Sequence, residues 1–156
     1  MALISIAALA MASALGVAFS HSSDSLLHTK TVQLAQAYIE EIQSRRFDEA
    51  TPIGGTPPCS VVTVSCSAIG PDSEVRVTFD DVDDYHGLDD LPPLDSLGQP
   101  LAEYPGFRVQ VEVAYPSAAQ LAAWLLDDVS DVKLITVTVT SPDGVVRTFP
   151  FVRGNY

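Results

Sequence analysis

The chain has 156 residues, 47% of them hydrophobic, which is enough for one domain with a core of its own. Twenty acidic residues against eight basic ones give a net charge of −12. This balance argues against nucleic acid as a partner, because a phosphate backbone is bound by clustered Lys and Arg. It also argues against a peripheral role on an anionic lipid surface.

The first 20 residues contain no charged side chain, and no Lys or Arg precedes Lys30. About 20 apolar residues are enough to cross a bilayer as a helix. A secretory signal peptide is the alternative, but such a peptide begins with basic residues, which are missing here. The sequence therefore predicts that residues 1–20 form the apolar, transmembrane or fibre-core half of a helix. Lipid, or the same helices of other subunits, would cover that half.

Residues 21–46 continue the helical pattern with a single apolar face. The residues of this face recur at spacings of three and four: Leu27, Thr31, Leu34, Ala35, Tyr38 and Ile42. No proline or glycine interrupts the run from Val17 to Phe47. The pattern predicts one helix of about 45 residues, whose amphipathic half packs on the rest of the chain.

Residues 47–156 are predicted to form a β-sheet-rich head domain. Prolines and glycines at 52–58 break the helix, and Ser117 is a plausible N-cap for a short helix over 117–128. The predicted strands are 61–65, 74–79, 107–115, 133–140 and 145–152, the last two joined by the turn SPDG at 141–144. This order predicts an α+β fold, with a long N-terminal helix packed on an antiparallel sheet.

Two cysteines, Cys59 and Cys66, flank a β-like spacer in CSVVTVSC. Zinc would need four ligands, and the CxxC spacing typical of zinc sites is absent. We interpret the pair as a disulfide formed in an oxidising compartment. The alternative interpretation is a pair of buried free thiols.

Several segments carry a resemblance to a known family: LAQAYIEEIQSRRFDE (34–49), FDDVDDYHGLDD (79–90), YPGFRVQVEVAY (104–115), and KLITVTVTSPDG with the terminal RGNY. Together with the helix, the sheet-rich head and the cysteine pair, they resemble type IV pilins. Within that class they resemble minor pilins of the mannose-sensitive haemagglutinin (MSHA) pilus, the MshD-like group. The resemblance implies a subunit that waits in the bacterial inner membrane with a periplasmic head and then enters an extracellular pilus. The implied partners are other major and minor pilins, bound through the N-terminal helix.

The chain departs from this family at its start. Pilins begin with a basic leader and a GFTLIE-like sequence, which prepilin peptidase cuts after the glycine. Neither feature precedes the apolar run, and no acidic residue occurs before Asp24. We expect the leader to lie upstream of Met1, which makes prepilin peptidase a further partner. The alternative is a member that has lost its processing site.

The segment 79–90 contains six aspartates in twelve positions. Carboxylate oxygens are ligands that calcium prefers, so Asp81, Asp83 and Asp84 are candidate calcium ligands. The segment does not meet the EF-hand pattern, because Tyr85 takes the third ligand position and Gly87 falls one place late. Calcium is therefore the weaker of two interpretations.

The favoured interpretation makes 79–90 a packed connector. Its apolar residues, at a spacing of three, would anchor it to the sheet while the carboxylates between them stay solvated: Phe79, Val82, Tyr85 and Leu88. In this interpretation the protein holds no cofactor.

Nothing in the sequence indicates an enzyme. Asp84 and His86 could form an acid–base pair, but no motif places a nucleophile beside them. Two functions remain. The first is a structural subunit, a minor pilin that contributes to pilus assembly and surface attachment. The second is a membrane-anchored or secreted periplasmic binding domain, with calcium as a candidate ligand.

Overall fold

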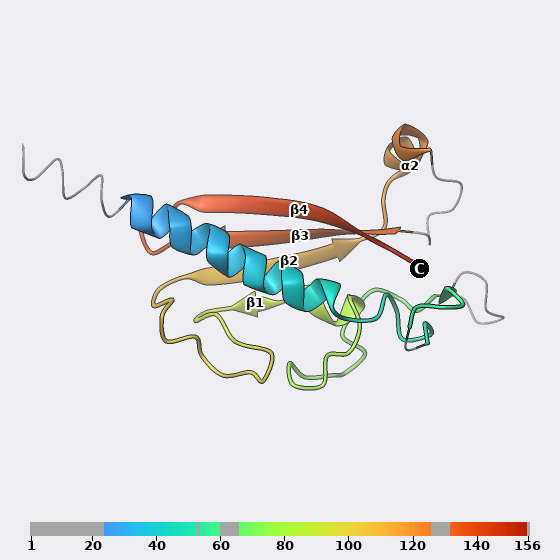
Figure 1. The fold of residues 1–156 in the computed structure, drawn as a ribbon, viewed down its shortest axis with the longest axis horizontal. Coiled ribbons are helices and arrows are strands. Elements are labelled where there is room, and N and C mark those ends of the chain that lie inside the picture. Colours follow the sequence, from blue (N-terminus) through green and yellow to red (C-terminus); the bar gives the residue numbers. More distant parts are fainter. Residues whose placement is uncertain (1–23, 53, 60–65, 126–131, 156) are drawn as a thin grey trace, which may run out of the picture.

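The computed structural model describes residues 24–52, 54–59, 66–125 and 132–155. A helix of residues 24–43 lies across one face of a four-stranded antiparallel sheet (Figure 1). The strands follow one another in the order of the chain: β1 (Asp89–Asp90), β2 (Arg108–Ala114), β3 (Val132–Thr140) and β4 (Val146–Gly154). The α+β plan predicted from the sequence is confirmed.

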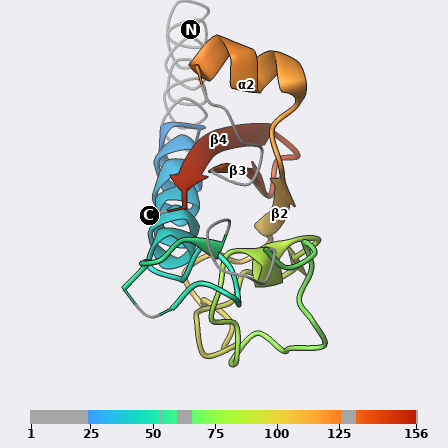
Figure 2. The ribbon, with the colours of Figure 1, turned by 90° about the vertical axis from the view of Figure 1, so that its right-hand side faces the viewer.

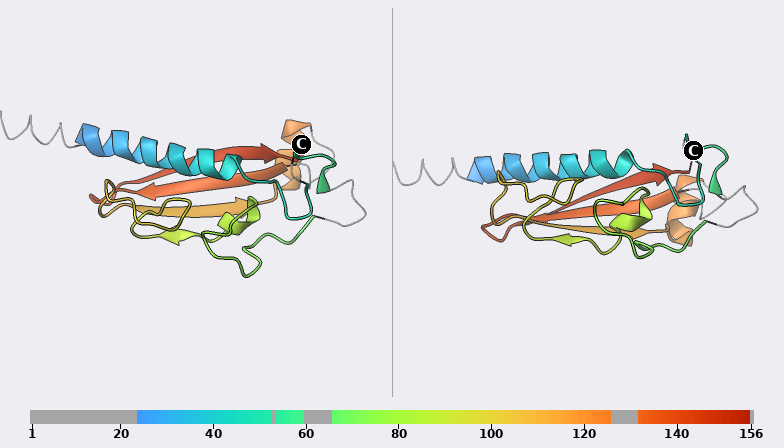
Figure 3. Two further views of the ribbon diagram at one scale, coloured as in Figure 1. Left: turned by 60° about the horizontal axis from the view of Figure 1, so that its bottom comes forward. Right: turned by 90° about the horizontal axis from the view of Figure 1, so that it is seen from below.

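The helix buries the face that its sequence predicts. Leu34, Ala35, Tyr38 and Ile42 are buried together with Thr31, and Leu27 packs at the edge of the same cluster. Figure 3 shows the helix running along the sheet in both views. Burying one large aliphatic side chain stabilises a fold by roughly 1.5–3 kcal/mol, so this face alone supplies a substantial part of the core.

Alternation along β2 and β3 supplies the other side of the core. The inward-facing residues are Val109, Val111 and Val113 on β2, and Ile135, Val137 and Val139 on β3. Val111 lies opposite Val137 and Val113 opposite Ile135 in the antiparallel register. A period of two places all six residues on one face of the sheet, which is the face that the helix covers.

The predicted hairpin at SPDG joins β3 to β4. Thr140 pairs with Val146, and the backbone N–H of Ser141 donates to the carbonyl of Val145. Gly144 closes the turn with a φ of 84°, a conformation that glycine adopts without the strain of a side chain. The turn residues therefore fix the register of the last two strands.

The short helix α2 (Ala118–Trp124) begins where the sequence predicts. Ser117 accepts a hydrogen bond from the backbone of Gln120, and the Gln120 side chain bonds back to the Ser117 backbone. The helix ends earlier than predicted, because Leu125 adopts the left-handed conformation. No residue of α2 is buried. The helix lies at one end of the sheet (Figure 1) and stands apart from it (Figure 2).

Two other predictions need correction. Residues 74–79 form hydrogen-bonded turns, with Glu74 N–H donating to Pro71 and Thr78 N–H donating to Val75. The alternation of polar and apolar residues in this stretch does not reflect strand pairing. Val75 and Val77 are exposed, whereas Arg76 between them points inward to its ion pair with Glu41. The long helix also ends at residue 43, before the predicted end at 46.

Some predictions fall on parts of the chain that lie outside the described residues. These are the apolar half of the helix at 1–20 and the strand at 61–65. Among the helices of the described residues, none combines the length and the apolar character that a membrane crossing requires.

Candidate functional site

The acidic segment 79–90 lies against both the end of the long helix and the sheet. Arg46 N–H donates to the carbonyl of Asp80, and Val82 N–H donates to the carbonyl of Arg46. The segment then forms the 3-10 turn η2 (Asp83–Tyr85) and enters the sheet as β1, where Asp89 pairs with Gln110. These backbone bonds make the segment a bridge between the helix end and the edge of the sheet.

The predicted apolar anchors of this segment are confirmed. Phe79, Val82 and Tyr85 are buried, and Leu88 packs partly buried against the core. The rings of Phe79 and Tyr85 meet edge to face, with centroids 5.2 Å apart. The segment is therefore a packed part of the domain.

The prediction that its carboxylates are solvated is wrong for three of them. Asp81, Asp83 and Asp84 are only 3%, 1% and 5% exposed. Asp81 Oδ1 accepts from the backbone N–H groups of Asp83 (2.7 Å) and Asp84 (3.3 Å), and Asp84 Oδ2 accepts from those of Asp80 (2.9 Å) and Asp81 (3.1 Å). Short carboxylates can replace water in this way wherever a tight turn presents free N–H groups.

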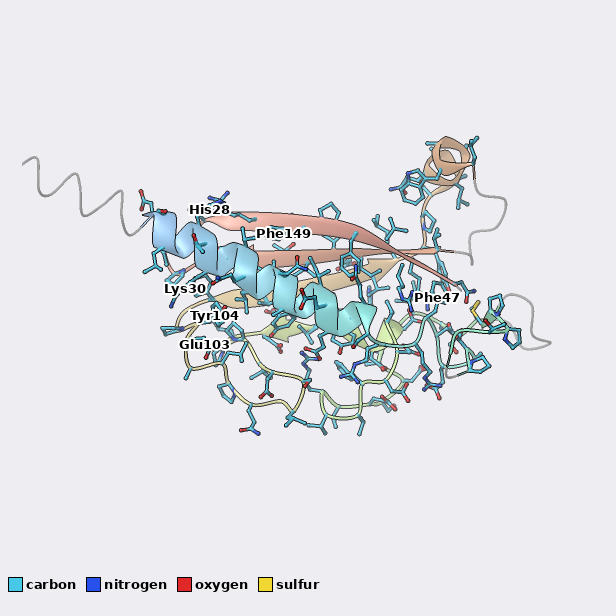
Figure 4. All side chains as sticks on the ribbon, in the orientation of Figure 1. His28, Lys30, Phe47, Glu103, Tyr104 and Phe149 are labelled. Carbon is cyan, nitrogen blue, oxygen red and sulfur yellow. A yellow bond between two sulfur atoms is a disulfide. The ribbon has the colours of Figure 1, made fainter. Side chains whose placement is uncertain are left out.

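The third buried aspartate bonds to a lysine at the start of β3. Lys133 is fully buried, and its Nζ donates to Asp83 Oδ2 at 2.6 Å, to the Phe47 carbonyl at 2.6 Å and to Asp48 Oδ2 at 3.3 Å. The Phe47 ring centroid lies 4.2 Å from the same nitrogen. Figure 4 places Phe47 beyond the C-terminal end of the long helix. All three N–H groups of the ammonium therefore have acceptors inside the protein.

Asp48 completes this cluster, which we call the Lys133 cluster (Lys133, Asp48 and Asp83). Its Oδ1 accepts from Ala50 N–H at 3.0 Å and its Oδ2 from Ser67 N–H at 2.9 Å. Sequence reasoning missed Lys133 and Asp48. The signal was present for the lysine, because alternation places position 133 on the inward face of β3 with Ile135 and Val137.

Burial of these carboxylates perturbs their titration. Burial raises the pKa of Asp81 to about 7, and the charges of Asp83 and Asp84 add to the rise. Burial likewise raises the pKa of Asp83 to about 6, although the Lys133 ammonium opposes the change. A carboxyl group in this state can hold or release a proton near neutral pH.

A second cation, the partly buried Arg76, ties the segment to the long helix. Its Nη1 and Nη2 donate to the two carboxylate oxygens of Glu41 at 2.6 and 2.8 Å. Tyr85 O–H donates to the same Glu41 at 2.7 Å. The guanidinium carbon lies 5.0 to 5.8 Å from the ring centroids of Tyr38, Phe79 and Tyr85. We call these residues (Arg76, Glu41, Tyr38, Phe79 and Tyr85) the Arg76 cluster.

The helix is also held near its other end. Lys30 Nζ donates to the carbonyl of Glu103 at 2.7 Å and lies 5.8 Å from the ring centroid of Tyr104. Figure 4 shows these three residues together beneath the first half of the helix. Both halves of the described helix are therefore fixed to the head.

The candidate calcium ligands Asp81, Asp83 and Asp84 bond to different donors. Backbone N–H groups donate hydrogen bonds to the carboxylates of Asp81 and Asp84, and the Lys133 ammonium donates one to that of Asp83. Among the described residues, the acidic side chains that approach within 4.8 Å of one another in threes are Glu49–Asp80–Asp81 and Glu74–Asp80–Asp84. Arg46 forms ion pairs with Asp80 and Glu49 and so already supplies a cation to this surface. Calcium binding remains a prediction.

The acid–base pair considered for Asp84 and His86 does not form in the described structure. Asp84 Oδ2 accepts from backbone N–H groups, and His86 Nδ1 accepts from Val113 N–H at 3.2 Å. Each side chain therefore accepts hydrogen bonds from backbone N–H groups, those of the same segment for Asp84 and that of β2 for His86.

The disulfide between Cys59 and Cys66 is confirmed, with an S–S distance of 2.04 Å. Cys59 is fully buried beside the C-terminal end of β4, where Asn155 Nδ2 donates to its sulfur. The bond closes a loop whose central residues, 60–65, lie outside the described part of the chain.

An N-terminal helix packed on a four-stranded antiparallel sheet, with a disulfide in the head, is an arrangement consistent with a pilin-like fold. Comparisons with family models, curated proteins and solved structures found no match to this chain.

Proposed function

We propose that the protein is a minor pilin of a type IV, MSHA-type pilus, which acts by being built into the fibre and catalyses no reaction. The observation that supports this most directly is the position of the helix. The described helix begins near one end of the sheet, and its residues 31–42 are held against the sheet (Figure 1). The first 20 residues of the sequence carry no charge and are apolar apart from three serines. A helix of this composition offers a larger apolar surface than a single head domain can cover.

The physical mechanism is an exchange of apolar surroundings. In the inner membrane, lipid would cover the apolar half of the helix, and in the fibre the same helices of other pilins would cover it. Transfer between two apolar settings costs little hydrophobic free energy, so side-chain packing and polar matching decide assembly. The net charge of −12 keeps the heads soluble outside the membrane.

The Lys133 cluster and the Arg76 cluster fit this role. A fibre subunit must transmit force between its helix and its head. The Arg76 cluster joins Glu41 of the helix to the acidic segment, and the Lys133 cluster joins the chain after the helix to the first residue pairs of β3. Both clusters link elements that tension on the helix would pull apart.

Gene deletion with complementation in the native bacterium tests the proposal. Deletion should reduce surface piliation and pilus-dependent attachment, and the full-length gene should restore both. A version lacking residues 1–20 should not, because its helix has lost the apolar half. As a matched control, full-length Arg108→Gln changes only an exposed side chain and should complement fully. Restoration of attachment by the version lacking residues 1–20 would contradict the proposal and favour a free periplasmic binding domain.

A further inference from the structure

The Lys133 cluster places an amine against a carboxyl group in a dry site. Nζ of Lys133 and Oδ2 of Asp83 are 2.6 Å apart, and the side chains are 0% and 2% exposed. Their surroundings include the rings of Phe47 and Tyr115, at 4.2 and 5.9 Å from the nitrogen. Two groups held at this distance by a fold need no further diffusion to meet.

The charges of the cluster do not balance. One ammonium faces two carboxylates, so the ionised cluster leaves an excess negative charge where water cannot solvate it. The carboxylate of Asp48 has enough hydrogen-bond donors, since it also accepts hydrogen bonds from two backbone N–H groups. Asp83 is not, because within the described residues its Oδ1 has no hydrogen-bond partner. Of the two carboxylates in the cluster, Asp83 therefore has the less well stabilised ionised form.

We propose that Lys133 and Asp83 condense into an intramolecular amide bond after the chain has folded, with Asp48 relaying the proton. This modification does not depend on the proposed role in a pilus. It would cross-link the start of β3 to the acidic segment and leave Asp48 as the acceptor beside the new amide.

The reaction balances without an outside reagent. A proton first passes from the Lys133 ammonium to the Asp83 carboxylate, giving a neutral amine and a carboxylic acid. The nitrogen lone pair attacks Cγ of Asp83, and the Nζ–Cγ bond forms as the carbonyl electron pair moves to oxygen. Asp48 then takes a proton from Nζ and delivers it to the hydroxyl of Asp83. The Cγ–O bond breaks, and one water leaves. An ammonium and a carboxylate are consumed, so net charge is unchanged.

Burial favours the amide over the separate ammonium and carboxylate. In water, an amine and a carboxylic acid prefer their hydrated ionic forms, which opposes condensation. Inside the cluster those forms lose their hydration, whereas the amide carries no charge to be solvated. Exclusion of water also removes the reagent that would hydrolyse the bond.

The chain contains two lysines, so each can report on the other. The full-length protein, purified in detergent, is denatured, treated with an amine-reactive reagent and digested with trypsin. Lys30 should be labelled, whereas Lys133 should carry no label and resist cleavage. Peptide 77–108 should appear joined to peptide 109–147, with a mass lower by one water than the sum of the two. Labelling of Lys133 in most chains, with separate peptides, would overturn the proposal.

Variants separate the reaction from simple stabilisation. Asp83→Asn should give the same cross-linked peptide pair, because an asparagine amide can form the same bond by losing ammonia. Asp83→Ala and Lys133→Arg should abolish the joined peptide. Asp48→Asn should slow its formation, because the relay is lost. Protein recovered from inclusion bodies and never folded should have both lysines labelled, which shows that folding is required. A joined peptide in that unfolded sample would contradict the proposed mechanism. The labelling of wild-type protein decides the proposal even if a variant fails to fold.

Discussion

Lys133 and Arg76 both hold the acidic segment in place, but their surroundings differ. Each is a cation that fastens the acidic segment to another part of the chain, and each has two carboxylates nearby. The Lys133 side chain and that of Asp48 are fully buried, whereas Arg76 and Glu41 retain 9% and 15% exposure. The lysine is enclosed by its partners, and the arginine lies at the rim of the core.

The difference follows from the shapes of the two cations. An ammonium is a compact charge with three donors in separate directions, and Lys133 directs them at acceptors from Phe47, Asp48 and Asp83. A guanidinium is a planar fork, and Arg76 uses it to hold both oxygens of one carboxylate while aromatic rings lie near its faces. Lys133 therefore connects residues from several segments through separate hydrogen bonds, whereas Arg76 binds the single carboxylate of Glu41 with two parallel hydrogen bonds.

The largest predicted effect is at Lys133. The substitution Lys133→Met keeps the volume but removes both the cation of the ion-paired cluster and the amine that would form the proposed amide, leaving two buried carboxylates unpaired. We expect the free energy of unfolding at neutral pH to fall by at least about 3 kcal/mol. Chemical denaturation followed by circular dichroism measures it. The matched control Lys30→Met removes the chain's other lysine, whose hydrogen bond is exposed, and should cost far less. Equal losses from the two variants would contradict the view that the Lys133 cluster is the enclosed one.

Arg76→Lys should have a smaller effect than Lys133→Met. Lysine keeps the charge but cannot hold both Glu41 oxygens or pack a flat face against the rings of Tyr38 and Tyr85. A loss of about 1–2 kcal/mol in the free energy of unfolding is expected, measured in the same way. Full retention of stability would mean that charge alone matters at this rim site, which would remove the contrast drawn between the two cations.

Asp81 provides a prediction in pH. Its pKa in the folded state, about 7, lies above its ordinary value of 3.8, so the folded chain binds the proton more tightly than the unfolded chain. The resulting stability is fully present below pH 3.8 and is lost as pH rises through 7. Asp81→Asn keeps an oxygen for the N–H groups of Asp83 and Asp84 and cannot ionise.

The measurement compares Asp81→Asn with the wild type at two pH values. At pH near 8 the variant should be more stable by about 1–2 kcal/mol in the free energy of unfolding, and near pH 5 this advantage should shrink. One carboxylate oxygen of Asp81 lies within 4.8 Å of oxygens of Glu49 and Asp80, which are acceptors for the new amide N–H group. A pH-independent difference between the two proteins would show that Asp81 does not titrate in this range.

The smallest effect is predicted at an exposed pair that belongs to the same acidic segment. Arg108 on β2 bonds to Asp89 on β1, but both side chains are more than 40% exposed. Surface ion pairs contribute little because water and salt screen them. Arg108→Gln should leave the thermal midpoint unchanged within error. A clear loss would mean that pairing with the sheet edge, and not burial, determines how the acidic segment is held.

The sequence by itself determined the parts of this protein that are buried by apolar periodicity or fixed by local turns. The spacing of three and four between apolar residues predicted the buried face of the long helix, from Thr31 to Ile42. A spacing of two chose the inward faces of β2 and β3, and Ser117 and Gly144 marked a helix start and a turn. The anchors Phe79, Val82, Tyr85 and Leu88 were predictable on the same grounds. In each case the hydrophobic effect or the local backbone geometry acts on neighbours along the chain.

Only the tertiary structure decided which charges are buried. Lys133 bonds to Asp83 and Asp48, which are 50 and 85 positions away, and Arg76 bonds to Glu41 across 35 positions. A charged residue looks solvated in the sequence because burying it alone would be prohibitive. It becomes tolerable only when remote segments bring opposite charges and N–H groups to it, and no local pattern records where those partners lie. The inward position of Lys133 on β3 showed that a partner was needed, and the fold determined which residues supply it.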